Sequence, residues 1–280
     1  MTIRFVRRAA LGAGLAAALA AGALLTGGPA GAASTGHAKF GIEGAPVDAA
    51  VPLTQTATFA AVPNRPRFWR ETVRPGARDT GPYAISHVYE VQIRLYRLGI
   101  YRNYPINGIY GWPVTNAVKT FQKQQKLPQT GTVDQATWAK LIDQSTRHSW
   151  GWTTLPAVCK SAGFHSCYSR YTYELFLLQN GTLWNSWMVR GGAAGLQTVT
   201  GTYRVYWQDK NHKSAAFHNA PMPYSQFFYG GEAIHGSATM IDPRVDHSHG
   251  CINMYIEDAA ELWTMTAGHP NTVTVYGPWR

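Results

Sequence analysis

The stretch Ile234 to Asn253, which reads IHGSATMIDPRVDHSHGCIN, determines how the rest of the chain is interpreted. It places Cys251 sixteen positions after His235, with His247 and His249 close by. A thiol becomes a good nucleophile near neutral pH when a neighbouring base or positive charge favours the thiolate, and imidazole is the usual neighbour. Gly250 lets the backbone come close to the group that Cys251 attacks, and amides at such a bend can point together at a developing oxyanion. This stretch therefore offers a nucleophile, a base and oxyanion donors.

The pattern of His-Gly, a short spacer and Ser-His-Gly-Cys-Ile-Asn resembles the signature of L,D-transpeptidases with a YkuD-type catalytic domain. The spacer before Ser248 is short for that family. The resemblance implies that Cys251 is the nucleophile and His235 the general base, with no cofactor. It also implies that the other motif positions shape the site (Ser248, His249, Gly250) or contact substrate (Gly236, Asn253).

A zinc site is the sharper alternative for the same stretch. Asp246, His247, His249 and Cys251 include alternating residues that would share one face of a strand, and imidazole and thiolate are ligands for zinc. Gly250 and Asn253 would have no purpose in such a site. We therefore expect no metal here.

The first 33 residues have the order of a secretory signal peptide: three arginines, an Ala/Leu/Gly run from Ala9 to Leu25, then small residues. An uncleaved membrane anchor is the alternative, because the apolar run is about as long as a marginal span. Residues 34–86 lack sustained periodicity and contain frequent Gly, Ala, Pro and Thr, which predicts a flexible linker. The expected location is therefore outside the cytoplasm, in the cell wall.

Export affects how the three cysteines are interpreted. Cys159 and Cys167 lie eight residues apart and are candidates for a disulfide, since disulfides persist outside the cytoplasm. Cys251 is then unpaired, as a nucleophile must be. The alternative is that all three are reduced and structural.

Composition and charge limit the partners. With 280 residues, 45% of them hydrophobic, the chain can bury a sizeable core. The net charge of +10 includes the three signal arginines, which leaves +7 (10 − 3) and favours anionic partners such as cell-wall polymers, or simply a solvated surface. The chain lacks a basic run or a recognised nucleic-acid-binding motif, so nucleic acid is not expected as a partner.

Residues 87–143 have helical periodicity. Apolar residues from Val88 to Leu98 keep to one face and Gly99 follows as a C-cap, a second helix carries Val114 to Phe121, and a third begins at Asp134. The segment resembles the three-helix peptidoglycan-binding domain at Gln92, Leu98-Gly99, Asn107-Gly108, Phe121-Gln122, Thr130-Gly131 and Thr137-Trp138. The resemblance implies docking on glycan or stem peptide. A purely structural spacer role is the alternative.

Residues 144–169 are expected to be a connector, and residues 170–280 a mainly-β, sandwich-like catalytic domain. Asn180-Gly181 predicts a hairpin between two strands, residues 200–207 and 273–276 predict further strands, and Glu257 to Trp263 predicts a helix. The aromatic stretch 211–229 suits a flap over a substrate groove, and we expect Tyr224 to contact substrate. The fold class is therefore a small all-α domain followed by a mainly-β domain.

The function expected from the resemblance is peptidoglycan L,D-transpeptidation, with roles in cell-wall biogenesis and cell shape. Cys251 would attack a donor stem peptide, form a thioester, and pass it to an acceptor amine so that the third residues of two stems are joined. Acylation by carbapenems is also implied. The alternatives are an L,D-carboxypeptidase, in which water is the acceptor, attachment of a protein to the wall, or an inactive wall-binding protein. A monomer is expected, with membrane contact only through an uncleaved signal segment.

Overall fold

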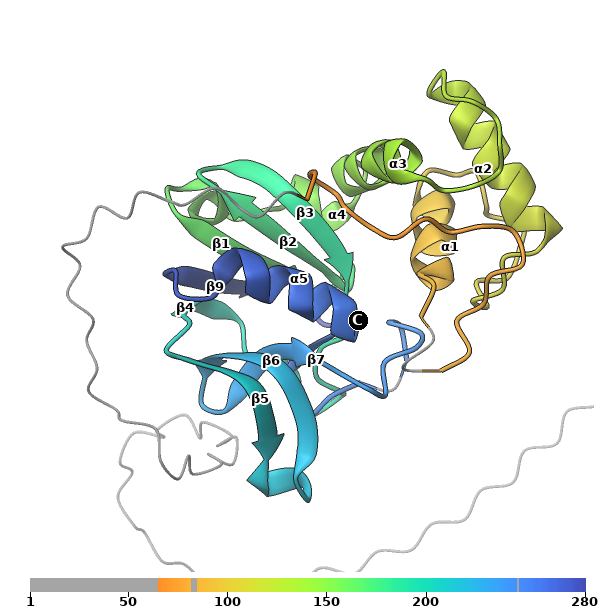
Figure 1. Cartoon of the computed structure of the whole chain (residues 1–280). Coiled ribbons are helices and arrows are strands. Elements are labelled where there is room, and N and C mark those ends of the chain that lie inside the picture. Colours follow the sequence, from red (N-terminus) through yellow and green to blue (C-terminus); the bar gives the residue numbers. More distant parts are fainter. Residues whose placement is uncertain (1–64, 82–84, 246) are drawn as a thin grey trace, which may run out of the picture. The chain divides into compact units, whose positions relative to one another are not determined.

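The computed structural model describes residues 65–81, 85–245 and 247–280. Three helices come first: α1 (Val88–Arg97), α2 (Trp112–Gln124) and α3 (Gln135–Arg147). Asp134 caps α3 by accepting a hydrogen bond from the Thr137 N–H at 2.8 Å, and Gly99 follows α1 with a φ of +79° that only glycine adopts readily. The strands follow the helices (Figure 1), which confirms the predicted fold class.

Two sheets make up the β-rich domain. The first has the order β3-β2-β1-β9-β4 and the second the order β5-β6-β7-β8. The strands of the first sheet are β1 (Phe164–Ser169), β2 (Glu174–Gln179), β3 (Thr182–Met188), β4 (Gly201–Arg204) and β9 (Asn271–Tyr276). Those of the second are β5 (Trp207–Ser214), β6 (Ala220–Tyr229), β7 (Glu232–Gly236) and β8 (Ile252–Met254). Short helices α4 (Trp150–Thr153), η1 (Ala157–Lys160) and η2 (Ala215–Phe217) lie in the connections.

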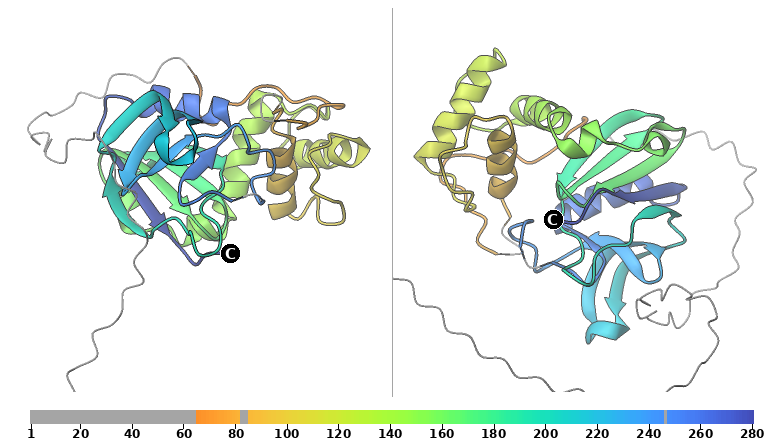
Figure 2. Two further views of the ribbon diagram at one scale, coloured as in Figure 1. Left: turned by 90° about the horizontal axis from the view of Figure 1, so that it is seen from below. Right: turned by 180° about the vertical axis from the view of Figure 1, so that it is seen from behind.

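The core of this domain lies between the two sheets and helix α5 (Ile256–Thr266). Leu175 and Trp187 from the first sheet pack in one apolar cluster with Ile234, Ile252 and Leu262. Helix α5 lies between the sheets in Figure 1 and contacts β6 and β7. The β5–β6 hairpin extends beyond its sheet (Figure 2). The flap over a substrate groove that the sequence suggests for residues 211–229 stays a prediction.

Strand β1 was not expected from the sequence, which predicts a connector there. The structure places Phe164–Ser169 in the middle of the first sheet, antiparallel to β2 and parallel to β9. All its side chains are buried, so it lacks the alternation of apolar and polar residues that marks a half-buried strand. A disulfide joins Cys167 of this strand to Cys159 of η1.

Residues 65–81 also differ from expectation, because this part of the predicted linker belongs to the folded unit. Phe68 and Arg70 are buried, and Val73 and Arg78 form β-bridges with Val133 and Ile109. The pairing is with distant residues, so the local sequence carries no sign of it. Residues 34–64 and 82–84 of the predicted linker, and the predicted signal segment, lie outside the described residues.

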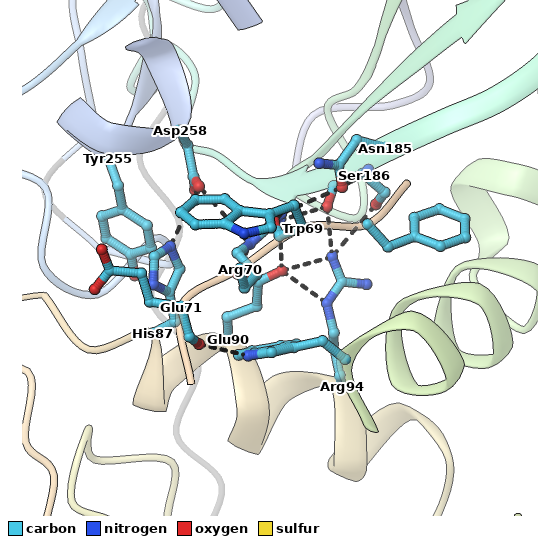
Figure 3. Close-up of polar contacts among 12 residues, drawn as sticks. Trp69, Arg70, Glu71, His87, Glu90, Arg94, Asn185, Ser186, Tyr255 and Asp258 are labelled. Atoms are coloured by element: carbon cyan, nitrogen blue, oxygen red, sulfur yellow. Dashed lines mark hydrogen bonds and ion pairs between the residues drawn. The ribbon is translucent and has the colours of Figure 1, made fainter. Parts of the chain in front are cut away.

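Arg70 anchors this segment in a buried polar network (Figure 3). Its guanidinium donates to Glu90 of α1 at 2.9 Å and to the Ser186 carbonyl of β3 at 2.8 Å. Arg94, one turn along α1, also binds Glu90, at 2.7 Å. The network therefore ties residues 65–81 and α1 to the first sheet through buried charges.

The same network contains the one group of metal-ligand side chains that converges in the described ranges: His87, Glu90 and Asp258. Arg70 supplies the positive charge among them, since its Nε lies 2.9 Å from Glu90 and 3.7 Å from Asp258. Burial opposes protonation of His87, but the Asp258 carboxylate at 3.2 Å raises the pKa of His87 to about 9. We interpret the cluster as a structural ion network.

Among the described helices, none is long and apolar enough to cross a membrane.

Candidate active site

Two parallel strands bring together His235 and the segment that carries Cys251. Strands β7 and β8 pair so that His235 lies opposite Asn253. Residues opposite each other share a face of the sheet. Cys251 lies just before β8 and packs against a cluster that includes Ala233, which is two positions before His235 and so on the same face of β7. Cys251 is partly exposed and packs against Met222, Phe227, Ala233 and Trp207.

His235 is buried, and partners engage both of its ring nitrogens. Nδ1 lies 2.8 Å from the carbonyl oxygen of Gly236, and Nε2 lies 2.9 Å from the side-chain nitrogen of Asn253. Burial lowers the pKa of His235 to about 4, and the charges of Arg190 and His212 add to this effect. The imidazole is therefore neutral near pH 7 and able to accept a proton.

The Cys251 thiol is protonated in the same structure. Burial is the main cause that raises the pKa of Cys251 to about 11; a hydrogen bond from the Ala233 backbone opposes it, and the charge of Glu232 adds to it. The sequence predicted that a neighbouring imidazole would favour the thiolate. The raised pKa contradicts that prediction, because burial among apolar side chains disfavours the charged form.

Ser248 and Gly250 shape the turn that presents the thiol. The Ser248 hydroxyl donates to the Cys251 carbonyl and accepts from the Gly250 N–H at 3.1 Å. The Ser248 backbone in turn donates to Gly191 at 2.9 Å. Gly250 has a φ of +131°, which strains any other residue. Both residues therefore act on loop geometry.

The remaining predicted site residues have other surroundings. His249 is exposed, with its ring 4.6 Å from that of Phe217. Gly236 packs tightly against α5, where an added Cβ would lie 3.2 Å from the Ile256 Cα. Its contact with the site is through its carbonyl oxygen, which lies 2.8 Å from Nδ1 of His235. The Tyr224 ring lies 6.2 Å from that of Trp263 on α5 and packs at the edge of the domain core. Contact of Tyr224 with substrate stays a prediction.

The zinc alternative gains no support from this geometry. His247 lies against Tyr173, with a ring separation of 5.5 Å, whereas His249 lies against Phe217 and Cys251 faces an apolar cluster. Within the part of the chain that the structure describes, these three do not converge on one point. Asp246 lies outside the described residues.

Sequence reasoning missed two residues of this site, Arg190 and Glu232. Arg190 is buried and donates from Nε to the Asn253 side-chain oxygen at 3.0 Å. Glu232 accepts from the Val199 N–H at 3.2 Å, and burial raises its pKa to about 7. Neither residue lies in a local pattern that could have signalled its role. Their significance comes from long-range contacts.

Comparison with known proteins gives two family matches. Residues 86–141 match the peptidoglycan-binding domain family, and residues 168–275 match the L,D-transpeptidase catalytic domain family, YkuD. A comparison with curated proteins gives no match.

The search of solved structures matches this chain to two L,D-transpeptidases, among others. The one from Stackebrandtia nassauensis has 23% identity over 77% of this chain and 98% of its own, with a TM-score of 0.46. The one from Xylanimonas cellulosilytica, residues 123–326, has 24% identity over 74% and 98%, with a TM-score of 0.41. L,D-transpeptidase 3 from Mycobacterium tuberculosis, solved with a faropenem-derived adduct, has 15% identity over 41% and 60%, with a TM-score of 0.37.

The family matches fall on the two parts of the fold described above, the helices and the two sheets. Together they support a cell-wall transpeptidase. The chain thus carries a peptidoglycan-binding domain at residues 86–141 and, at residues 168–275, a catalytic domain of the L,D-transpeptidase family.

Proposed function

We propose that this protein is an exported peptidoglycan L,D-transpeptidase that works through a thioester on Cys251. The observation that carries the proposal is the β7–β8 register, which sets His235 opposite Asn253, two positions after Cys251, while Cys251 packs against the cluster that contains Ala233 of β7. The carbonyl of Gly236 holds Nδ1 of His235 and leaves Nε2 as the basic nitrogen. A nucleophile, a base and a group that orients the base are the parts that acyl transfer requires.

In the proposed reaction, Sγ of Cys251 attacks the carbonyl of the donor's third residue while Nε2 of His235 takes the thiol proton. Both groups are neutral at rest, because burial raises the pKa of the thiol and lowers that of the imidazole. Proton transfer is therefore coupled to attack, and the thiol must first replace the Asn253 amide at Nε2. The bond to the terminal D-alanine breaks, and His235 returns the proton to the leaving amine.

Backbone amides would stabilise the developing oxyanion. The Gly250 N–H already donates to Ser248, which leaves the amides of His249 and Cys251 as the candidates. An amine of a second stem peptide then attacks the thioester, the C–S bond breaks, and the thiol regains its proton. The product joins the third residues of two stems.

The proposal extends to location and partners. Residues 1–33 would direct export, and the peptidoglycan-binding domain would hold the enzyme on glycan or stem peptides. The excess of positive charge suits the anionic polymers of a cell wall. Work on the wall outside the cytoplasm would contribute to its biogenesis and to cell shape, and nothing in this reaction requires more than a monomer.

The test is the intact mass of the mature protein after exposure to a carbapenem, which would imitate the donor carbonyl. One covalent adduct is expected on the wild type and none on Cys251→Ala, while a chelator should have no effect. His235→Gln should slow adduct formation strongly. A folded, reduced wild type that forms no adduct would contradict the proposal.

A second assay separates the reaction outcomes. The enzyme is given a tetrapeptide stem as donor together with a stem that carries a free side-chain amine. A cross-linked dimer supports transpeptidation, whereas a tripeptide alone would indicate an L,D-carboxypeptidase.

A further inference from the structure

Arg190 is held in place by several elements of the active site at once. Its backbone N–H and carbonyl pair with those of Asn253 at 3.1 and 2.8 Å, beside strand β8. Its terminal guanidinium nitrogens reach the loop after β7, contacting the hydroxyls of Ser237 and Thr239 and the Val245 carbonyl. These contacts fix the plane of the guanidinium and hence the direction of Nε.

That direction determines which way the Asn253 amide points. Nε of Arg190 donates to Oδ1 of Asn253 at 3.0 Å, and an arginine can only donate. The amide nitrogen of Asn253 must therefore point away from Arg190, and it lies 2.9 Å from Nε2 of His235. A flipped amide would place two donors against each other at Arg190.

The same logic then fixes the proton on the imidazole. An amide NH₂ only donates, so Nε2 of His235 must carry the lone pair. The ring proton sits on Nδ1 and donates to the Gly236 carbonyl at 2.8 Å, a group that only accepts. Three successive contacts thus agree on a single tautomer, the one in which Nε2 is the base.

We propose that Arg190 is a positioning residue that sets the tautomer of the catalytic base through the side-chain amide of Asn253. The inference rests on the proposed function, because it gives His235 the role of base. The positive charge of Arg190 acts in the same direction, since it opposes protonation of the imidazole. His212 of β5 adds to that effect, while Glu232 and Cys251 are the titratable groups on the thiol side.

The test uses the full chain labelled with ¹⁵N-histidine, because long-range N–H couplings distinguish the two neutral tautomers. His235 is assigned by comparison with His235→Gln. The wild type should show the Nδ1–H form, with no titration near pH 6.5. In Arg190→Met the Asn253 amide is free to flip, so a mixture of tautomers and a higher pKa of His235 are expected.

Thr239→Val is the matched control. It removes one contact of Arg190 with the loop and leaves the contact with Asn253, so the tautomer should be unchanged. An unchanged tautomer in folded Arg190→Met would overturn the proposal. So would an equal change in Thr239→Val, because Arg190 would then act only by supporting the loop.

Asn253→Asp keeps the test decisive if Arg190→Met does not fold. A carboxylate only accepts, so it should favour a proton on Nε2 and raise the pKa of His235. An unchanged tautomer and pKa of His235 would overturn the proposal.

In the carbapenem assay, Arg190→Met should acylate about 10- to 100-fold more slowly at neutral pH, the loss expected for one charge-assisted hydrogen bond. The tautomer is read without ligand, so failure of the wild type to acylate would count against the proposed function and leave this result intact.

Discussion

The carboxyl group of Glu232 lies directly against the α-carbon of Gly250, so that a Cβ added there would sit 3.1 Å from Oε1 of Glu232. This contact places a partly buried acid beside the turn that presents Cys251. A substitution of either residue should therefore disturb the surroundings of Cys251, although neither residue is proposed to bond to substrate.

Gly250→Ala should impair acylation as well as stability. The φ of +131° strains an alanine by about 1 to 3 kcal/mol, and the new methyl group must displace either Glu232 or the turn. Gly163→Ala is the control, because Gly163 has a φ of +96° with open space around it. Both variants should lose stability in urea, and only Gly250→Ala should slow carbapenem acylation. Equal acylation rates would contradict this interpretation.

Glu232→Gln should make the thiol more reactive. Burial is the main cause of the raised Cys251 pKa, and the Glu232 charge adds to it. Removing that charge should speed alkylation by iodoacetamide at pH 8 by up to about tenfold, the change that one pKa unit makes in the thiolate fraction. Glu261→Gln is matched, since the pKa of Glu261 is also about 7 and its hydrogen bond is to Asn185. The same acceleration in Glu261→Gln would show that the effect is not local.

The low pKa of His235 should appear in stability as a function of pH. The folded protein holds this imidazole neutral down to about pH 4, whereas an unfolded histidine takes up a proton near the ordinary value of 6.5. The unfolded state binds more protons between these values, so the contribution of His235 is complete above pH 6.5 and is lost as the pH falls to 4. The Tm difference between wild type and His235→Gln should shrink over that window. A Tm difference that grows as the pH falls would contradict a lowered pKa of His235.

Glu90→Gln should destabilise the fold strongly. It removes the charge that Arg70 and Arg94 share, and breaking a buried pair costs about 3 to 5 kcal/mol. Asp143→Asn is the control, because its partner Arg147 is half exposed and such pairs contribute about 0 to 1 kcal/mol. Urea denaturation measures both. Similar losses in the two variants would mean that burial of the network is unimportant.

The disulfide should contribute stability and leave the chemistry unchanged. Closing the short loop between Cys159 and Cys167 stabilises the fold by about 2 to 3 kcal/mol in the chain-entropy model. The double variant Cys159→Ser with Cys167→Ser should lose that amount in urea and still form the carbapenem adduct. Loss of the adduct from a folded double variant would assign these residues a part in the site.

Local signals predicted the regular elements well. The three helices, the Asp134 cap and the Asn180-Gly181 hairpin depend on neighbouring residues, and all are present. Strand β1 was missed because burial on both faces removes its period of two. Residues 65–81 were missed because Arg70 binds partners that are distant in sequence.

The candidate site shows the same division. The motif identified Cys251, His235 and the turn around Gly250, but the thiol pKa depends on side chains from β5, β6 and β7 that only the fold brings together. The role proposed for Arg190 likewise depends on its hydrogen bond to the side-chain amide of Asn253 on β8. Electrostatics and tautomers are properties of the assembled site, so a sequence pattern does not contain them.

The parallel pairing of β7 and β8 also has a consequence for engineering. The base and the residue opposite it are held by a shared backbone ladder, and the loop between the two strands contributes no rung to it. The strand spacing therefore does not depend on the exposed Arg244 and Val245 side chains, which could be exchanged. Thr239 and Met240 are the positions of that loop to keep in any redesign, because Thr239 contacts Arg190 and Met240 is buried.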